Sequence, residues 1–461
     1  MKKYLAYFVL YYLRFFARLQ LKKHPQLQII GVTGSAGKSS TRNAIYQILK
    51  GKYRVKASFS ANSESGIPLD ILGLSMRDYS LFDWARVLML APIKACCSRI
   101  DADYYIVEMG IDSPHPPKNM EFLLSIIRPN QAVFLSVGVN HAFAFDHLVR
   151  ENNPLKKQNA LKRLIGKEKA KLVLSLPKQG LAILNKDDKF VMETSEKLAC
   201  KSLSFGQAAT ADLRITDHQI KIKYDQQKQL SDIVSSFEFV WQNLHAKQKK
   251  QKMRLEFEGL CLPFHYAHSL AAALLLGSMA GLSLQEMKKS LEEEWRPPAG
   301  RASVIGGRHH SLIIDSSYNA SSMQDFIDLF ASLKLQHGRK IALLGDMREL
   351  GDSTATLHQN LAKTIAPIFD EIHLVGQSMS DYALPILQEQ GHSLVFWHPS
   401  SQQAGKVLRN RLQKNDLLLV KGSQNTIFLE EAIKQIMAKS NSAKLLCRQS
   451  AWWMKVKLSA S

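Results

Sequence analysis

The sequence predicts an α/β fold, in which a central domain with a phosphate-binding loop and a parallel sheet precedes a Rossmann-like C-terminal domain. Two observations predict it. An apolar run at residues 27–32 enters a glycine-rich loop ending in Gly37-Lys38-Ser39, and apolar residues at helical spacing follow. Further apolar runs end in polar residues or glycine, as parallel strands do where ligands bind.

Length and charge limit the classes of protein to consider. A chain of 461 residues is too long for one core, so two or three domains are expected. The net charge of +21 indicates anionic partners such as nucleotides or a membrane surface. The basic run at residues 245–254 carries no aromatic residue, which predicts an exposed loop and no nucleic-acid partner. Five cysteines without CxxC spacing predict free thiols in a reducing cytosol.

The first 26 residues form an aromatic and basic segment. Residues 4–13 are uncharged, but a bilayer-spanning helix needs about 20 apolar residues. Arg14, Arg18 and Lys22 recur every four residues and share one face of a predicted helix. Residues 1–23 therefore either make a peripheral membrane contact or pack on the protein itself or a partner subunit. The predicted location is the cytoplasm, and a membrane contact by this segment would be with the inner face of the membrane.

The loop at residues 33–40 is the strongest signal in the chain. Small residues bring backbone N–H groups close to a ligand, a helix N-terminus favours negative charge, and Lys38 neutralises phosphate. The Ser39 hydroxyl suits Mg²⁺. We expect a nucleoside triphosphate to be bound here, with Mg²⁺ as the companion ion, by Gly34, Ser35, Ala36, Gly37, Lys38, Ser39 and Ser40.

Strands are predicted in order along the chain, with a β excursion at residues 190–262 and a long apolar helix within 259–281. Residues 297–300, Pro-Pro-Ala-Gly, mark a domain boundary. The strands are expected at 104–107, 132–137, 311–314, 340–344, 371–375 and 417–420. The predicted parts are an amphipathic segment 1–26, a central domain 27–297, a C-terminal domain 298–440 and a basic tail 441–461.

Several segments stand in the order found in one enzyme family. These segments resemble motifs of the Mur ligase superfamily, ATP-dependent enzymes that form the amide bonds of the peptidoglycan stem peptide. They are TGSAGKS, IVEMG, SVGVNHAF, IGKEKAKL, LNKDD, GR, IIDSSYNA, LLGDMRELG and LLLVKGS. The GDMRELG block is similar to the branch that adds D-alanyl-D-alanine. The resemblance implies a central ATPase domain and a C-terminal ligase domain.

The resemblance also implies catalytic and metal-binding roles. Glu108 and His141 match Mg²⁺ ligands, and Lys169 matches a lysine that the superfamily carbamylates to a metal-binding anion. This match depends on register, because Lys167 and Lys171 lie on the same basic stretch, which could equally be a solvated helix face. The expected catalytic residues are Lys38, Glu108, His141, Lys169 and Arg301. The expected metal ligands are Glu108, His141, Lys169 and Ser39.

Further ligand contacts follow from the same resemblance. Asn185, His268, Arg301 and Asp315 match nucleotide-binding positions, while Asn319, His358 and Lys421 match the substrate side. The chain departs from the family at Ser136, Phe143, Phe264 and His265, and His268 itself replaces an asparagine. Only residues 1–26 precede the first strand, so the family's uridine-nucleotide-binding domain is expected to be absent or replaced.

The activity implied is addition of D-alanyl-D-alanine to a muramyl-peptide carboxylate through an acyl phosphate, with the two domains closing on ATP. Two alternatives stay open. One is another amino-acid ligase of the superfamily, of the folylpolyglutamate or γ-glutamyl type. The other is a membrane-associated nucleotide-binding subunit that needs a partner.

Overall fold

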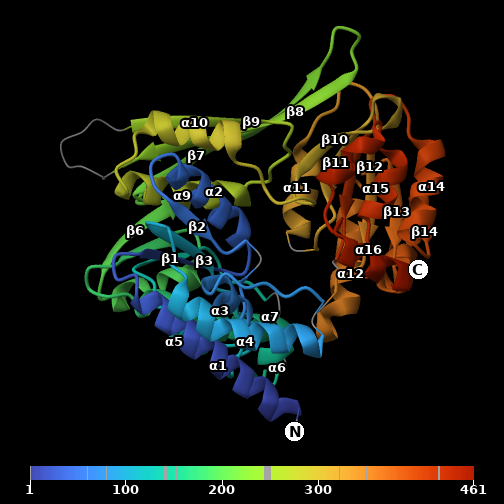
Figure 1. The fold of residues 1–461 in the computed structure, drawn as a ribbon. Helices are drawn as coiled ribbons and strands as arrows, with labels where there is room; N and C mark the ends of the chain where they lie inside the picture. Colours follow the sequence, from blue (N-terminus) through green and yellow to red (C-terminus); the bar gives the residue numbers. More distant parts are fainter. Residues whose placement is uncertain are drawn as a thin grey trace. The chain divides into compact units, whose positions relative to one another are not determined.

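The computed structural model describes residues 2–59, 61–78, 80–139, 143–151, 153–242, 251–320, 322–348, 350–423 and 426–460. The chain forms two compact units (Figure 1). Both are built from parallel sheets with helices, so the predicted fold class is confirmed. Unit 1 comprises Met1–Thr216, Glu238–Leu255 and Tyr266–Arg296, and unit 2 comprises Asp217–Phe237, Glu256–His265 and Pro297–Ser461.

The sheet of unit 1 has the strand order β2-β3-β1-β4-β5-β6-β7-β8-β9, and its β7, β8 and β9 extend into segments assigned to unit 2. β1 pairs in parallel with β3 and β4 and is almost entirely buried, since both faces of a parallel sheet are covered. The strands are β1 (Gln28–Thr33), β2 (Val55–Ala57), β3 (Tyr104–Glu108), β4 (Gln131–Phe134), β5 (Leu181–Asn185), β6 (Lys201–Gly206), β7 (Leu213–Tyr224), β8 (Leu230–Trp241) and β9 (Gln251–Glu258).

Helices cover both faces of this sheet. Figure 1 shows α1, α3, α4 and α5 on one side of β1 and β3, and α2, α9 and α10 on the other. Ala44, Ile45, Ile48 and Leu49, whose spacing predicts a helix, are buried on α2. The helices are α1 (Lys2–Lys22), α2 (Lys38–Lys50), α3 (Gly66–Ile71), α4 (Leu81–Cys97), α5 (Met120–Ile126), α6 (Phe143–Asp146), α7 (Pro154–Leu174), α8 (Lys189–Met192), α9 (His265–Met279) and α10 (Leu284–Glu294).

The N-terminal helix α1 packs on its own unit along one face. Leu13 and Ala17 are fully buried. The Tyr12 hydroxyl donates to the Leu88 carbonyl of α4 at 3.0 Å, and Arg14 donates to Ser125 Oγ of α5 at 3.1 Å. Of the two alternatives, packing on the protein's own surface is therefore observed for this face. None of the described helices combines the length and apolar character needed to cross a bilayer.

Unit 2 carries a second sheet with the strand order β10-β11-β15-β12-β13-β14, parallel except for β10. Its central strands lie where the sequence predicts them. β10 and the edge strand β14 were not predicted, because each is short and only partly buried. The strands are β10 (Ser303–Gly306), β11 (Leu312–Ser316), β12 (Lys340–Gly345), β13 (Glu371–Val375), β14 (Val395–His398) and β15 (Leu417–Lys421).

The helices of unit 2 include a C-terminal pair beyond the last strand. The segment that charge predicts as a basic tail packs on this unit, and Arg448 and Lys457 are both buried in ion pairs with Glu430. The helices are α11 (Met323–Ser332), α12 (Thr354–Ile365), α13 (Leu384–Glu389), α14 (Ser401–Arg411), α15 (Glu430–Ile436) and α16 (Ala451–Ala460).

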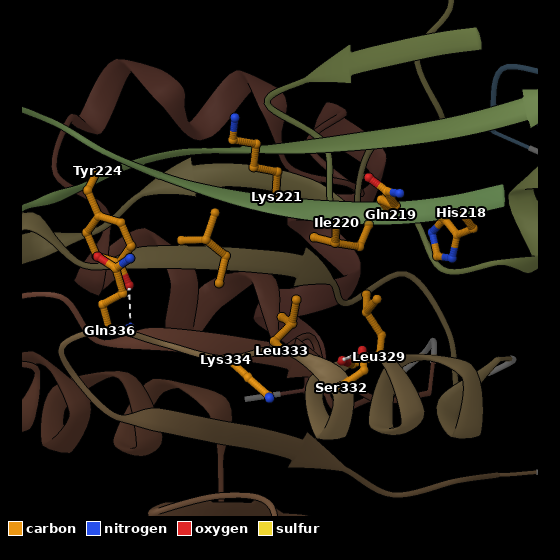
Figure 2. A pocket seen from close by; sticks show the side chains of 11 residues that line it. His218, Gln219, Ile220, Lys221, Tyr224, Leu329, Ser332, Leu333, Lys334 and Gln336 are labelled. Atoms are coloured by element: carbon orange, nitrogen blue, oxygen red, sulfur yellow. Dashed lines mark hydrogen bonds between the residues drawn. The ribbon is translucent and has the colours of Figure 1, made fainter.

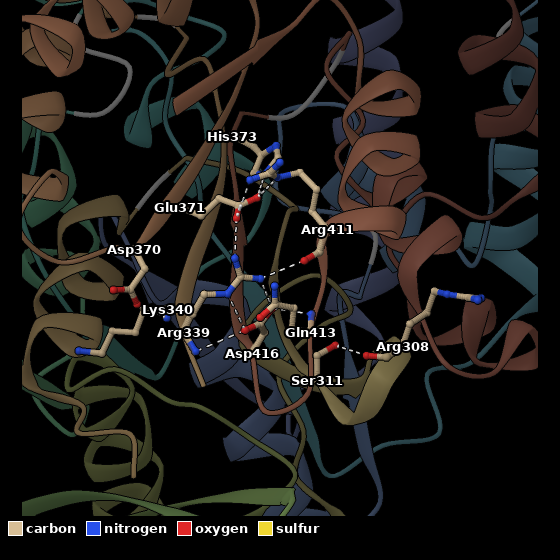
Figure 3. Close-up of polar contacts among 10 residues, drawn as sticks. All are labelled: Arg308, Ser311, Arg339, Lys340, Asp370, Glu371, His373, Arg411, Gln413 and Asp416. Carbon is tan, nitrogen blue, oxygen red and sulfur yellow. Dashed lines mark hydrogen bonds and ion pairs between the residues drawn. The ribbon is translucent and has the colours of Figure 1, made fainter. Parts of the chain in front are cut away.

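A buried polar network ties the strands of unit 2 together (Figure 3). Glu371 on β13 is fully buried and accepts bonds from Arg339 Nη1 at 2.8 Å, Arg411 Nε at 2.6 Å and His373 Nε2 at 2.8 Å. Burial alone would raise the pKa of Glu371, but His373 and Arg411 outweigh it and lower the pKa to about 2. The carboxylate therefore stays charged and holds β13 to α14 and to the start of β12.

A histidine pair extends the network to β14. His373 Nδ1 lies 2.8 Å from His398 Nε2. Because His373 Nε2 donates to Glu371, its Nδ1 accepts a hydrogen bond from His398 Nε2–H, so both rings fit the neutral form. Burial, with His373 adding to it, lowers the pKa of His398 to about 4.

This pair should make unit 2 sensitive to acid. An unfolded histidine has a pKa near 6.5, so between about pH 4 and 6.5 the unfolded chain binds more protons at His398 than the folded one. Stability should therefore rise with pH across this window, by about 1–2 kcal/mol once solvent screening is allowed for. Hydrogen–deuterium exchange of β13 and β14 peptides in urea should show this slope.

Two matched variants test whether His398, and not another histidine, causes the acid sensitivity. In His398→Asn the amide can still donate to His373 but does not titrate, so the slope between pH 4 and 6.5 should flatten. His309→Asn, at an exposed position, should keep the wild-type slope. An unchanged slope in His398→Asn would show that His398 does not cause the acid sensitivity.

Candidate active site

The phosphate loop of unit 1 is hydrogen-bonded to the segment that follows β4. Gly37, at φ 82°, turns the chain into α2 in a left-handed conformation that favours glycine. Ser35 N donates to the Ser136 carbonyl at 2.9 Å, and Ala36 N to Ser136 Oγ at 3.3 Å. Ser35 Oγ in turn accepts from Gly138 N at 2.7 Å. Ser136, a departure from the family pattern, thus shapes the loop beside the N-terminus of α2, where anions bind well.

Glu108 lies at the end of β3 beside the loop. Its carboxylate is buried, and Ser39 Oγ lies 2.9 Å from Oε2. Arg42 Nη1 on α2 donates to the same oxygen at 3.1 Å and to the Ser58 carbonyl at 2.8 Å. The backbone N–H of Glu108 is itself bound by Ser58 Oγ at 3.1 Å. The structure therefore brings together Ser39 and Glu108, two of the predicted metal ligands.

Two lysines converge on the loop from different helices. Lys38 Nζ donates to the Gly34 carbonyl at 2.8 Å, and Lys169 Nζ on α7 donates to the same carbonyl at 3.3 Å. Lys169 is buried. Burial first, and then the nearby charge of Lys38, lower the pKa of its amine to about 7, against the opposing effect of Asp112 and Glu168. Lys169, and not the exposed Lys167, therefore faces the phosphate loop.

The oxygen donors of this cluster fit Mg²⁺. Magnesium prefers a hydroxyl and one or two carboxylates, with water and phosphate oxygens completing its shell, and Ser39 and Glu108 supply such a pair. Within the part of the chain that the structure describes, no three His, Cys, Asp or Glu side chains gather in a metal site. His141, the remaining predicted ligand, lies outside the described residues.

The predicted nucleotide residues Asn185 and His268 also lie in unit 1. Asn185 is buried at the end of β5, where its Nδ2 donates to the Leu135 carbonyl at 2.8 Å and its Oδ1 accepts from Asp187 N at 3.0 Å. His268 Nε2 on α9 lies 3.2 Å from Asp187 Oδ2. Ser269, one residue on, donates to the Gly37 carbonyl at 3.4 Å. These bonds join β5 and α9 to the surroundings of the phosphate loop.

In unit 2, a second cluster forms at the end of β11. Asp315 is fully buried; its Oδ1 accepts from Ser317 N at 3.0 Å, while its Oδ2 has no hydrogen-bond partner among the described residues. Burial raises the pKa of Asp315 to about 6. The guanidinium of Arg301 lies 4.6 Å from the Tyr318 ring centre. A buried carboxylate oxygen without a partner is costly, which marks this position as one suited to a ligand.

Lys421 and Asn319 belong to the same cluster. Lys421 Nζ at the end of β15 donates to the Asn319 carbonyl at 3.1 Å and to Ser316 Oγ at 3.3 Å. Burial lowers the pKa of Lys421 to about 7; Arg301 adds to this effect, and Asp325 opposes it. The structure therefore brings Arg301, Asp315, Asn319 and Lys421 together.

His358, the remaining predicted substrate residue, has a different environment. It is fully buried on α12; its Nε2 accepts from Met347 N at 3.0 Å, and its Nδ1 lies 2.7 Å from the Thr354 carbonyl. Both ring nitrogens are thus engaged inside unit 2. In this structure His358 holds the turn after β12 in place and presents no nitrogen to a ligand.

Two arginines at these clusters were not predicted. Arg42 binds Glu108, and Arg448 donates to the Ser317 carbonyl at 3.0 Å and the Tyr318 carbonyl at 2.9 Å. The signal for Arg42 was its place one helical turn after Lys38, on the same face of α2. For Arg448 there was no local signal, because its partners lie about 130 residues earlier in the chain.

The cavity in Figure 2 lies elsewhere in unit 2. It has a volume of about 550 Å³ and lies between β7 and α11 with the chain after it. Tyr224 Oη accepts there from Gln336 N at 3.0 Å. No predicted site residue lines it, so the candidate site rests on the two clusters and not on this cavity.

Comparison with known proteins shows similarity to Mur ligases. The model of the Mur ligase middle domain matches residues 155–252, and that of the Mur ligase glutamate ligase domain matches residues 300–424. UDP-N-acetylmuramoyl-tripeptide--D-alanyl-D-alanine ligase of Synechocystis sp. is 26% identical over 420 residues, which cover 90% of this chain and 75% of that protein. The enzyme of the same name from Bacillus subtilis is 23% identical, covering 89% and 76%.

A solved structure gives the same result for the fold. The MurF ligase from Thermotoga maritima, determined in complex with ADP, superposes with a TM-score of 0.69 at 21% identity, covering 92% of this chain and 83% of that one. The matched domains stand in the order in which the sequence motifs predict them. The chain therefore has the fold of a Mur ligase and contains regions that match two Mur ligase domain models.

Proposed function

We propose that this protein is an ATP-dependent amide ligase of peptidoglycan precursor synthesis, which adds D-alanyl-D-alanine to a muramyl-peptide carboxylate. The observation that carries the proposal is the cluster at the phosphate loop, where Lys38, Ser39, Glu108 and Lys169 converge. The names of the relatives from Synechocystis and Bacillus subtilis support the choice of amine. Residues 27–297 and 298–440 are the proposed central and C-terminal domains.

The reaction has two steps. A carboxylate oxygen of the acceptor attacks the γ-phosphorus of ATP, the bond to the β-phosphate oxygen breaks, and an acyl phosphate and ADP form. The amine of D-alanyl-D-alanine then attacks the acyl carbon, phosphate leaves, and the nitrogen loses a proton. Both steps need positive charge near phosphate oxygens, which Lys38 and the N-terminus of α2 supply in unit 1.

Mg²⁺ and carbamylated Lys169 complete the proposed site. Ser39 and Glu108 would hold the ion together with His141 and the carbamate, and when bound it neutralises charge on the phosphates. Arg301 and Asp315 would contact the nucleotide from the C-terminal domain, and Asn319 and Lys421 the substrate. The proposed place of action is the cytoplasm.

One assay tests the proposed reaction against its alternatives. Phosphate release is measured with ATP, D-alanyl-D-alanine and muramyl peptides that are either UDP-linked or lipid-linked. Release that needs both D-alanyl-D-alanine and one acceptor supports the proposal. Release with glutamate and a folate instead would favour another amino-acid ligase, and release only after addition of a partner protein would favour the subunit alternative.

Removing Lys38 should abolish turnover. Lys38→Ala takes away a cation at the transferring phosphate, so ADP formation should fall by at least about 100-fold. Lys50→Ala, at the far end of the same helix, removes an equal charge and should leave the rate unchanged. Near-normal ADP formation by Lys38→Ala would place the active site elsewhere.

Lys169 should carry a carbamate near neutral pH. A carbamate forms when a neutral amine attacks CO₂ and loses one proton, and a pKa of about 7 leaves most of the Lys169 amine neutral at pH 8. Protein in ¹³C-bicarbonate should therefore show a carbamate resonance that weakens below pH 7.

Arginine variants locate this signal. The resonance should vanish in Lys169→Arg and persist in Lys167→Arg, a matched change at the exposed neighbour. The opposite pattern would move the modified lysine by two positions and shift the metal site with it.

A further inference from the structure

Helix α1 has a second apolar face that is largely exposed, although Tyr11 at its edge packs against Phe122 of α5. Leu5, Phe8 and Phe15 are each 62% exposed, and Tyr11 is 44% exposed. These residues recur at helical spacing on the side opposite the buried Leu13 and Ala17. A helix that only needed to pack on its own unit would carry polar residues at these outward positions.

Helix α4 repeats the same pattern beside α1. Its outward residues Leu81, Phe82, Met89 and Ile93 are 84%, 90%, 73% and 55% exposed, whereas Val87, Ala91 and Ala95 are buried. The sequence alone gave no reason to join this helix to α1, because about 60 residues separate them.

The two helices lie side by side in parallel (Figure 1). Tyr12 of α1 bonds the Leu88 carbonyl of α4, and further along Gln20 Nε2 donates to the Ser98 carbonyl at 3.1 Å. Lys23 Nζ donates to carbonyls of the last turn of α4, including that of Cys96 at 2.8 Å. Together the outward residues form what we call the α1–α4 face: Leu5, Phe8, Tyr11 and Phe15 with Leu81, Phe82, Met89 and Ile93.

The exposed charges on α1 are basic, and the exposed Asp78 lies just before α4. The first acidic residue of the whole chain is Glu64, so α1 has none, and Arg18 and Lys22 are exposed on it. The acidic residue of α4, Asp83, is buried and paired with Arg86 at 2.6 Å. Exposed aromatic residues bordered by lysine and arginine suit the interface of an anionic bilayer, where rings enter the headgroup region and cations meet phosphate.

We propose that the α1–α4 face binds the surface of an anionic lipid bilayer, with both helices lying in the plane of the interface. A second copy of the chain fits less well, because a two-fold contact through this face would bring Arg18 and Lys22 of both copies close together. A nucleic acid would meet the cations but leave the apolar residues exposed to water. The proposal is independent of the ligase reaction.

Vesicle binding by the full chain tests the proposal. The protein should sediment with vesicles of phosphatidylcholine containing phosphatidylglycerol, more weakly with phosphatidylcholine alone, and more weakly at high salt. Phe8→Ser and Phe82→Ser, one on each helix, should each lower the partition coefficient about tenfold, because each removes a phenyl ring that the bilayer would bury. Arg18→Gln with Lys22→Gln should remove most of the preference for anionic lipid.

The control is an equally exposed apolar residue outside the face. Leu155→Ser, at a position 73% exposed like Met89, should bind vesicles as the wild type does. A fluorophore on Met89→Cys, with Cys96 and Cys97 replaced by serine, should shift to the blue when vesicles are added, and one on Leu155→Cys should not.

Three outcomes would overturn the proposal. They are absence of vesicle binding by the wild type, unchanged binding in Phe82→Ser, and dissociation of a dimer by Phe8→Ser without any effect of lipid. Each variant alters an exposed residue, so its folding can be verified by thermal unfolding, and ATP turnover provides a separate readout that the proposal leaves unchanged.

Discussion

The buried carboxylate of Glu108 is the constraint around which the site of unit 1 is organised. A carboxylate away from water needs positive charge and hydrogen-bond donors, and α2 provides both through Arg42 and Ser39. Arg42 lies four residues after Lys38, one helical turn along the same face. The residue that neutralises Glu108 therefore also fixes the rotation of α2, and with it the direction in which Lys38 and Ser39 leave the phosphate loop.

The cation pair above the loop follows from this arrangement. With Lys38 directed at the Gly34 carbonyl, the amine of Lys169 reaches the same oxygen from α7 and meets a positive charge in a buried place. Its pKa falls chiefly because burial disfavours the charged amine, and the nearby charge of Lys38 adds to this effect. A neutral amine is the form that can react with CO₂, so the same burial that makes a lysine costly in the folded chain prepares it for the proposed conversion into an anionic ligand.

Local patterns explain how much of this was predictable. The strand, loop and helix at residues 28–50 follow from apolar spacing and glycine placement, and the central strands of unit 2 from short apolar runs. The choice of Lys169 over Lys167 rested on the resemblance alone, because a stretch of alternating charges does not indicate which lysine is buried. Arg448 could not be found, since its position depends on the packing of the C-terminal segment against Ser317 and Tyr318. His358 matched a family motif by its position, but the hydrogen bonds of its two ring nitrogens depend on tertiary packing and could not be predicted.

Helix α1 shows the same limit and its physical cause. A helical stripe of aromatic residues indicates a face that avoids water, but α1 carries two such faces, and one-dimensional spacing cannot say which of them the fold covers. The structure buries the aliphatic residues Leu13 and Ala17 and leaves the rings of Phe8 and Phe15 largely exposed. The buried residues hold α1 on unit 1, whereas the largely exposed rings of Phe8 and Phe15 contact the neighbouring rings of Tyr12 and Phe16 on α1. Their surface is bordered by the basic residues Arg18 and Lys22, so it favours an apolar medium with negative headgroups over a second copy that carries the same charges.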